Sequence, residues 1–251
     1  MAKKDVASIV SGAGWIAGFA DKLIRDLRAA GKTNEEIHAL VTDDGEESMN
    51  RLVAGVLEHM VPRHRVAELL EKYFAEVHKF SLNLTGVKFP EQEGFPTWMA
   101  VPPELDEDRI MQCTTEYFEV NPYSWHTPLA ANIDRTKAQR RPSGLYVFAH
   151  GGGDEPDDVH RHKSYDDVMV QHIPFMNPKE YLLATGFHRY LIGYFMDRIG
   201  WTKTSSLWVD GHLVGGRWRE ASARLCLDSG LPDYRLPDDG LREVFLGDFS
   251  L

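Results

Sequence analysis

The segment from Leu207 to Phe245 constrains the fold of this chain more than any other stretch. It holds an Asp210-Gly211 turn signal, a Gly-Gly-Arg-Trp run over 215–218, and a second turn signal at Pro232. Glycine allows close approach to the backbone, tryptophan brings a large apolar ring whose N–H needs an acceptor, and Pro-Asp is typical of turns. Polar and small residues occupy most other positions. The segment therefore predicts a rigid scaffold that displays a variable surface, which favours binding over catalysis.

The frame residues of this segment resemble the C-terminal signature of the formylglycine-generating-enzyme branch of the C-type lectin fold. The matching residues are Gly215, Gly216 and Trp218, then Ala223 with Arg224, Pro232 with Arg235, and Gly240 with Arg242. Arg217 stands where the signature usually has Ser, and Leu241 where it has an aromatic residue. The same branch contains the variable proteins of diversity-generating retroelements, in which selected codons near the C-terminus are rewritten and the fold tolerates the result. The resemblance implies a lectin-like domain with a candidate variable region at 207–245.

The cysteines argue against the enzymatic activity of that branch. Its enzymes rely on a cysteine pair that binds copper, whereas Cys226 has no second cysteine nearby and Cys113 lies far away in the sequence. The resemblance therefore implies a binding protein, and we expect no cofactor. Two cysteines are also too few for a disulfide framework, so a reducing, cytoplasmic location is expected.

Nine side chains of the C-terminal segment are expected to face a ligand. Arg and Tyr combine large contact area with hydrogen bonding, and Ser and Asp suit adaptable binding surfaces. The nine are Arg217, Arg219, Glu220, Ser222, Arg224, Asp228, Ser229, Asp233 and Tyr234. Trp208 and Trp218 are expected in the scaffold instead. The alternative interpretation is an ordinary solvated loop between two strands.

Charge and hydropathy exclude two classes of partner. With 28 Lys and Arg against 38 Asp and Glu, the formal net charge is −10, whereas nucleic-acid binding needs a basic surface. No apolar run reaches the roughly 18 residues that a membrane span requires. We therefore expect an unidentified protein or small-molecule ligand at the C-terminal surface, no nucleic acid and no membrane span.

Two domains are expected, with their boundary near residue 82. Hydrophobic periodicity predicts helices over about 15–27, 37–40, 49–57 and 62–77, and Thr33 with Glu36 fits a capping box. Residues 1–82 are therefore predicted to form a small all-α domain, which is a candidate site for a further partner. Residues 83–251 are predicted to form an α+β, C-type-lectin-like domain.

Periodicity also predicts the elements of the second domain. The expected strands cover 97–101, 116–120, 145–149, 205–209, 212–218, 224–227 and 242–246. A helix is expected from Pro178, in its first turn, to Gly200, as its C-terminal stop. The Asp210-Gly211 pair is expected to close a hairpin between the strands on either side.

The polar stretch from His150 to His172 indicates an alternative function. A His-x-His pair on a strand places both rings on one face, which suits a transition metal. The alternative is a metal-dependent enzyme that uses His150, His160 and His162, and the competing interpretation is a solvated acidic loop with incidental histidines. Neither a Gly-x-Ser-x-Gly nucleophile motif nor a phosphate-cradling loop occurs.

Overall fold

A computed structural model describes residues 24, 27–28, 31–39, 63–89, 92–153 and 155–247. The chain divides into two compact units, Met1–Ala54 and Gly55–Leu251. In the first unit, helix α2 (Asn34–Ala39) begins with the predicted capping box: the Thr33 hydroxyl accepts from the Glu36 N–H, and the Glu36 carboxylate accepts from the Thr33 N–H. The helices predicted over 15–27 and 49–57 lie largely or wholly outside the described residues.

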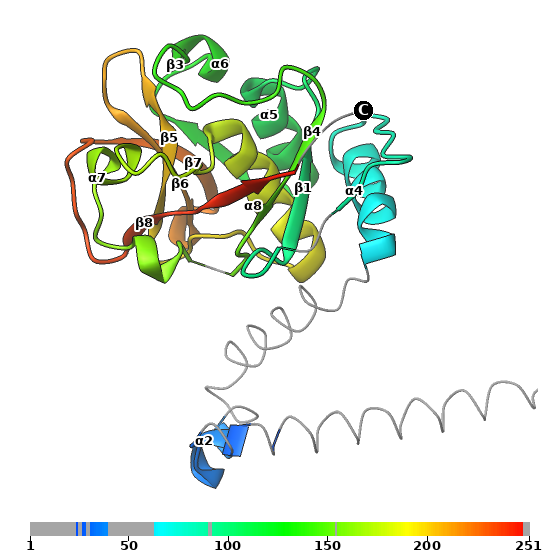
Figure 1. Ribbon diagram of the computed structural model, residues 1–251, viewed down its shortest axis with the longest axis vertical. Coiled ribbons are helices and arrows are strands. Elements are labelled where there is room, and N and C mark those ends of the chain that lie inside the picture. The colour runs from blue at the N-terminus through cyan, green and yellow to red at the C-terminus, as the bar shows by residue number, and fades with distance from the viewer. Residues whose placement is uncertain are drawn as a thin grey trace, which may run out of the picture. The chain divides into compact units, whose positions relative to one another are not determined.

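Two β-sheets and the helices around them build the second unit, which is a mixed α+β fold (Figure 1). The smaller, antiparallel sheet has the order β1 (Thr97–Val101), β4 (Tyr146–His150) and β9 (Val244–Leu246). The larger sheet has the order β2 (Asn121–Ser124), β7 (Arg224–Gly230), β6 (Leu213–Arg219), β5 (Trp201–Trp208) and β3 (Ile133–Asp134). An additional strand, β8 (Asp239–Leu241), pairs with β5 in parallel.

Helix α8 (Pro178–Ile192) lies between the two sheets (Figure 1) and contacts β1 on one side and β5 and β6 on the other. Every side chain from Glu180 to His188 is buried. A helix that is covered on all sides in this way belongs to the interior of a domain. The main hydrophobic core therefore forms around α8, with Tyr181, Leu182 and Leu183 among its members.

The ends of α8 follow from local signals. Asn177 caps the helix, since its side chain accepts from the Glu180 N–H while the Glu180 carboxylate accepts from the Asn177 N–H. The helix ends at Gly193, which has φ +94°. The predicted end at Gly200 was wrong, because Gly193 already provides the left-handed C-terminal residue that glycine favours.

Helix α4 (Arg63–Val77) packs on α8 through a close contact. A Cβ at Gly186 would come within 2.5 Å of the Tyr73 hydroxyl oxygen, and that hydroxyl donates to the Leu183 carbonyl at 3.3 Å. The sequence pattern assigned this helix to residues 1–82. Its packing places it in the second unit instead, and the division between the units follows Ala54.

Helix α5 (Glu107–Tyr117) and strand β2 replace the strand predicted over 116–120, which was wrong. Asp106 caps α5 by accepting from the Arg109 N–H at 2.8 Å, and the helix buries Ile110 and Met111. The other predicted strands and the hairpin at Asp210-Gly211 are confirmed. The shorter helices are α6 (Leu129–Asn132) and α7 (Tyr165–Met169), and the 3-10 turns are η1 (Asp158–His160) and η2 (Glu220–Ser222).

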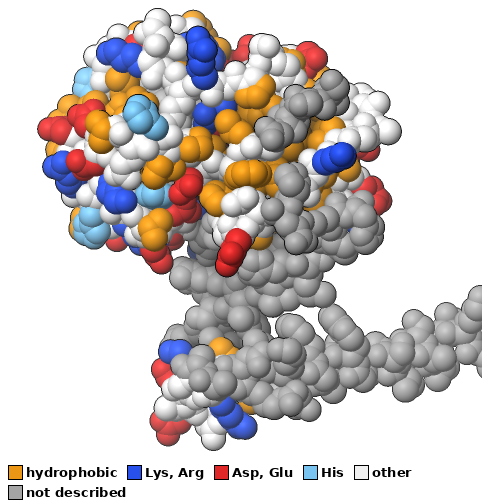
Figure 2. All heavy atoms as spheres, in the orientation of Figure 1, with side chains coloured by type: hydrophobic (Ala, Val, Ile, Leu, Met, Phe, Trp, Pro, Cys, Tyr) orange, Lys and Arg blue, Asp and Glu red, His pale blue; other side chains and the backbone are white. Residues whose placement is uncertain are grey.

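Charged side chains of both signs lie among apolar ones on the face shown in Figure 2. No large patch of purely positive or purely negative side chains therefore marks a binding site on that face. Candidate sites have to be found from the contacts of particular residues.

Candidate binding surface on the β6–β7 hairpin

The β6–β7 hairpin turns one face toward the core and the other away from it. Val214 and Trp218 of β6 and Leu225 and Leu227 of β7 all belong to the main hydrophobic core. The Trp218 ring lies 4.7 Å from the ring of Phe195, centroid to centroid. Because side chains alternate along a strand, the residues between these positions face the opposite side. Trp218 and Trp208, both buried, are confirmed as scaffold residues.

The opposite face carries a group of charged side chains that we call the arginine surface: Arg217, Arg219, Arg224 and Asp228. Arg219 donates through Nη2 to Asp228 Oδ2, and Nη2 of Arg217 lies 3.7 Å from the same oxygen. Arg224 is exposed and pairs with Arg219 in the strand register. The side chains of Arg217 and Arg219 are 38% and 34% exposed. Four of the nine predicted residues therefore come together on one accessible face.

Tyr123 of β2 extends this surface and was missed by the sequence analysis. The Arg219 guanidinium carbon lies 5.2 Å from the centroid of the Tyr123 ring, in the range of cation–π contact. The strand register places Tyr123 beside Cys226, which belongs to β7. About one hundred residues separate β2 from β7 in the sequence, so no local pattern could reveal the contact.

Unpaired donors remain on the arginine surface. Within the described part of the chain, Nε of Arg217 and Nε of Arg219 have no hydrogen-bond acceptor. A buried N–H without an acceptor costs free energy. Both nitrogens are themselves buried, so they are a local cost of holding the two guanidinium groups in place and are not contact points for a ligand.

Arg217 and Asp228 share their face of the β6–β7 hairpin with Gly215 and Gly230. The ring of Trp201 covers this face at the two glycines, next to the arginine surface. A Cβ at Gly215 would approach the Trp201 ring to 2.0 Å, and one at Gly230 would approach it to 2.4 Å. On the core side of the strand, a Cβ at Gly216 would meet the Tyr181 ring at 2.0 Å. The Gly215-Gly216 pair is therefore required for close approach of an aromatic ring to each face of β6.

The η2 turn contains two predicted residues with different roles. The Glu220 carboxylate accepts from the Trp218 indole N–H at 2.6 Å, so this side chain supports the scaffold. Ser222 is exposed, and its carbonyl is 3.5 Å from the Asn121 side-chain nitrogen. Ala223 ends the turn with φ +46°. The Glu220 side chain is also 67% exposed, so both predicted side chains are displayed, and of the two Glu220 additionally holds the scaffold tryptophan.

The remaining predicted residues lie elsewhere. Ser229 alternates with Asp228 along β7, on the side of Leu227, and therefore faces away from the arginine surface. Asp233 and Tyr234 belong to the exposed 231–238 loop, where the Tyr234 carbonyl accepts from the buried ammonium of Lys203 at 2.7 Å. These three residues do not belong to the arginine surface as defined by its contacts.

Cys226 lies beneath the arginine surface. It is fully buried, and burial raises the pKa of its thiol above the ordinary value. Because the thiolate is the form that attacks substrates and binds metals, the protonated thiol at this position does not provide a reactive group at neutral pH. Cys113 is also buried, and both cysteines are free.

The histidines between His150 and His172 do not converge. His150 is buried at the end of β4, whereas His160 ends η1 with its Nε2 3.1 Å from Glu243 Oε2. His162 is exposed and has φ +59°. The metal alternative requires a His-x-His pair on a strand, whereas His160 ends a 3-10 turn and is buried, and His162 is exposed in the left-handed region. Among the described residues, no group of three or more His, Cys, Asp or Glu side chains could hold a metal ion.

Two arginines of the C-terminal segment occupy contrasting environments. Arg242 is 1% exposed, and it donates through Nη2 to Asp197 Oδ1 at 2.7 Å and through Nη1 to the Gly152 carbonyl at 2.9 Å. Arg235 donates at the surface to both carboxylate oxygens of Asp167, at 2.8 and 2.9 Å, and holds the pKa of that carboxyl below its usual range. Arg242 therefore belongs to the scaffold, whereas Arg235 ties the 231–238 loop to α7.

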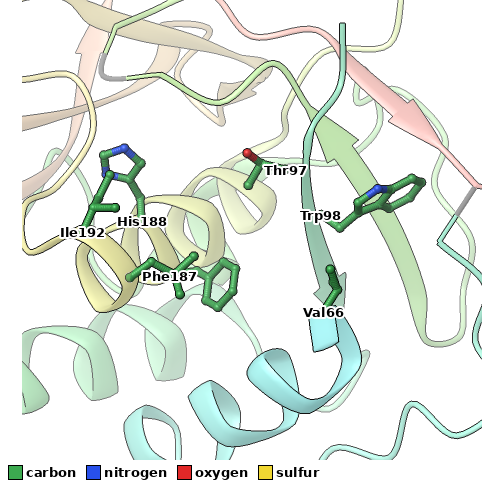
Figure 3. Close-up of a pocket in the computed structure, with 7 residues that line it drawn as sticks. Val66, Thr97, Trp98, Phe187, His188 and Ile192 are labelled. Carbon is green, nitrogen blue, oxygen red and sulfur yellow. The ribbon is translucent and has the colours of Figure 1, made fainter. Parts of the chain in front are cut away.

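A small cavity lies between α4, β1 and α8 (Figure 3). Its volume is about 30 Å³, and its walls are Val66, Thr97, Trp98, Phe187, His188, Leu191 and Ile192. A volume of that size holds about two water molecules. The cavity is therefore too small for an organic ligand.

Comparison of the chain with models of protein families, with curated proteins and with solved structures found no match. None of the described helices combines the length and the apolar character that a membrane crossing requires.

Proposed function

We propose that this chain is a ligand-binding protein and that the ligand binds at the arginine surface of the second unit. The scaffold is C-type-lectin-like, and the side chains of the arginine surface can be exchanged without loss of the fold. In this proposal the chain resembles the variable proteins of diversity-generating retroelements. The observation that carries the proposal is the alternation along β6 and β7. Core residues such as Trp218 and Leu225 alternate with Arg217, Arg219, Arg224 and Asp228, whose side chains do not contribute to the hydrophobic core.

The charge of the surface indicates the kind of ligand. This surface holds three arginines and one aspartate, of which Arg217 and Arg219 contact Asp228, in a chain whose net charge is −10. The aromatic ring of Tyr123 lies beneath Arg219 and adds apolar contact area. Arg and Tyr are the side chains that most often dominate binding energy at interfaces. The ligand of this particular sequence is therefore expected to carry acidic groups.

Two matched libraries test the proposal. The first varies Arg217, Arg219, Ser222, Arg224 and Asp228, and the second varies the core positions Val214, Trp218, Leu225 and Leu227. We expect most members of the first library to remain folded, as judged by cooperative thermal unfolding, and most members of the second to be unfolded. Equal losses in the two libraries would contradict an exchangeable surface.

Sequencing the DNA that encodes residues 200–251 across a population tests the diversification itself. A near-copy of the segment that differs at adenine positions, beside a reverse-transcriptase gene, is the expected result. An invariant segment without such a copy would overturn the proposed diversification, and the library experiment would then test ligand binding alone.

A further inference from the structure

A second candidate site is a pocket of about 400 Å³ at the first turn of α8. Its walls contain four cationic side chains, Arg135, Arg140, Arg141 and Lys179, and one carboxylate, Glu107. No residue of the arginine surface lines it. The pocket lies within the second unit, between the 138–144 segment and α8, with the ends of β1 and α5 beside it (elements labelled in Figure 1).

Two of the four cations are neutralised by buried carboxylates. Arg141 donates to both carboxylate oxygens of the fully buried Glu180, at 2.6 and 3.0 Å. Arg135 donates through Nη2 to both oxygens of Glu107, at 3.0 and 2.8 Å, and Glu107 is 1% exposed. These pairs build the wall of the pocket, and among the residues that the structure describes, Nε and Nη1 of Arg135 have no hydrogen-bond partner.

In the described part of the chain, the other two cations form no ion pair with a carboxylate. Within the described residues, the guanidinium of Arg140 forms no hydrogen bond or ion pair. The ammonium of Lys179 donates to the Pro102 carbonyl at 2.6 Å. Burial lowers the pKa of Lys179 and the charge of Arg135 lowers it further, while the carboxylates of Glu107, Asp106 and Glu104 oppose that effect. After the two ion pairs are counted, the wall retains two positive charges in a chain with a net charge of −10.

The 138–144 segment, which supplies Arg140, is held in place by its neighbours. The Gln139 amide donates to the Ile173 carbonyl at 2.7 Å and accepts from the Phe175 N–H at 2.9 Å. Arg141, on the other side of Arg140, donates to the Phe175 carbonyl at 2.5 Å. Because the side chains of both neighbours are anchored, the backbone at the exposed Arg140 is held before any ligand binds, which lowers the entropic cost of binding.

We propose that this pocket binds a small organic phosphate, with the phosphate group between Arg140, Lys179 and the unpaired edge of Arg135. A phosphate monoester carries about −1.5 to −2 charges at neutral pH, which matches the unpaired charge of the wall. Guanidinium groups bind phosphate through two parallel hydrogen bonds, and lysine binds it as a point charge. The volume falls in the range of about 300–1,000 Å³ that is usual for small-molecule sites, so the pocket has room for an organic part beyond the phosphate.

Isothermal titration calorimetry of the full chain with glycerol 3-phosphate tests the proposal. We expect saturable binding at one site, weakened by about tenfold or more in Arg140→Gln, since one charge-assisted interaction is lost. Lys179→Gln is expected to weaken binding similarly. The control is Lys137→Gln, which removes an exposed positive charge next to the 138–144 segment but outside the pocket wall.

Three results would overturn the assignment. They are the absence of saturable binding, equal binding by Arg140→Gln and Lys137→Gln, and tighter binding of succinate than of glycerol 3-phosphate. Thermal unfolding of each variant separates lost binding from lost folding, and Arg140 is exposed, so its substitution leaves the core untouched. The libraries at the arginine surface do not alter this pocket, so the two proposals can fail independently.

Discussion

The indole of Trp201 occupies the space beside Gly215 that a side chain would otherwise fill, with ring atoms 2.0 Å from the position of a Cβ there. Strand β5, which carries Trp201, pairs with β6 such that Lys203 lies opposite Gly215. The ring therefore reaches diagonally across the sheet toward Gly230 on β7. This contact covers one end of the face that carries the arginine surface.

Gly215→Ala is expected to lower the free energy of unfolding by about 1–3 kcal/mol, because the added methyl group overpacks a buried contact. The matched control is Gly144→Ala, since a Cβ at Gly144 meets nothing within 4 Å. That control is expected to be neutral or to stabilise by up to about 1 kcal/mol. Urea denaturation measures both, and equal stability of the two variants would disprove the role of Trp201.

Arg242→Met is expected to destabilise the protein by about 3–5 kcal/mol, because it leaves the buried carboxylate of Asp197 without its cation. Adding Asp197→Asn to this variant should recover part of the loss, since the unpaired charge is then removed. Arg235→Met is the comparison, because its ion pair with Asp167 lies at the surface. Its effect should be far smaller, and a similar effect of both arginine substitutions in thermal denaturation would refute the assignment of Arg242 to the scaffold.

Stability is expected to fall as the pH drops below about 6.5, partly through His78. This ring lies 3.0 Å from the Tyr73 hydroxyl, and burial, helped by the charge of Arg109, lowers its pKa to about 3. The folded state therefore keeps His78 neutral while the unfolded chain takes up a proton between pH 6.5 and about 3. The resulting loss approaches about 1.4 kcal/mol per pH unit within that window.

Denaturation of His78→Gln over a pH series measures this contribution. The variant should show a shallower decline between about pH 6 and pH 4 than the parent protein. The control is His162→Asn, which changes an exposed histidine with φ +59° to another residue that accepts this backbone conformation. An unchanged slope in His78→Gln would show that another group causes the pH dependence.

Glu220→Ala is expected to cost about 1 kcal/mol, because the Trp218 indole N–H loses its acceptor. Ser222→Ala, two residues away in the same turn, should stay within about 0.5 kcal/mol of the parent protein. The difference in melting temperature distinguishes the side chain that holds the scaffold tryptophan from one that is only displayed. If Ser222→Ala were the more damaging change, the scaffold role of Glu220 would be refuted.

Local sequence signals were sufficient to predict those structural features whose stabilising contacts join residues close together in the sequence. The Thr33–Glu36 capping box, the Asp210-Gly211 hairpin and the alternation of Trp218 with Arg217 and Arg219 could all be predicted, because each follows from neighbouring residues and strand periodicity. The sequence also indicated that the Gly215-Gly216 pair permits close approach to the backbone. It did not identify the aromatic rings that make this approach, Trp201 and Tyr181.

Tertiary structure decided the features that depend on distant partners. Helix α4 joins the second unit because Tyr73 meets Gly186, more than one hundred residues away, and Tyr123 joins the arginine surface because β2 pairs with β7. Long-range packing also separates Arg242, in the interior, from Arg235, at the surface. The sequence determined which residues could form strands, turns and caps, since those depend on local backbone preferences. Burial and pairing between distant segments determined which of these residues support the fold and which remain available for a ligand.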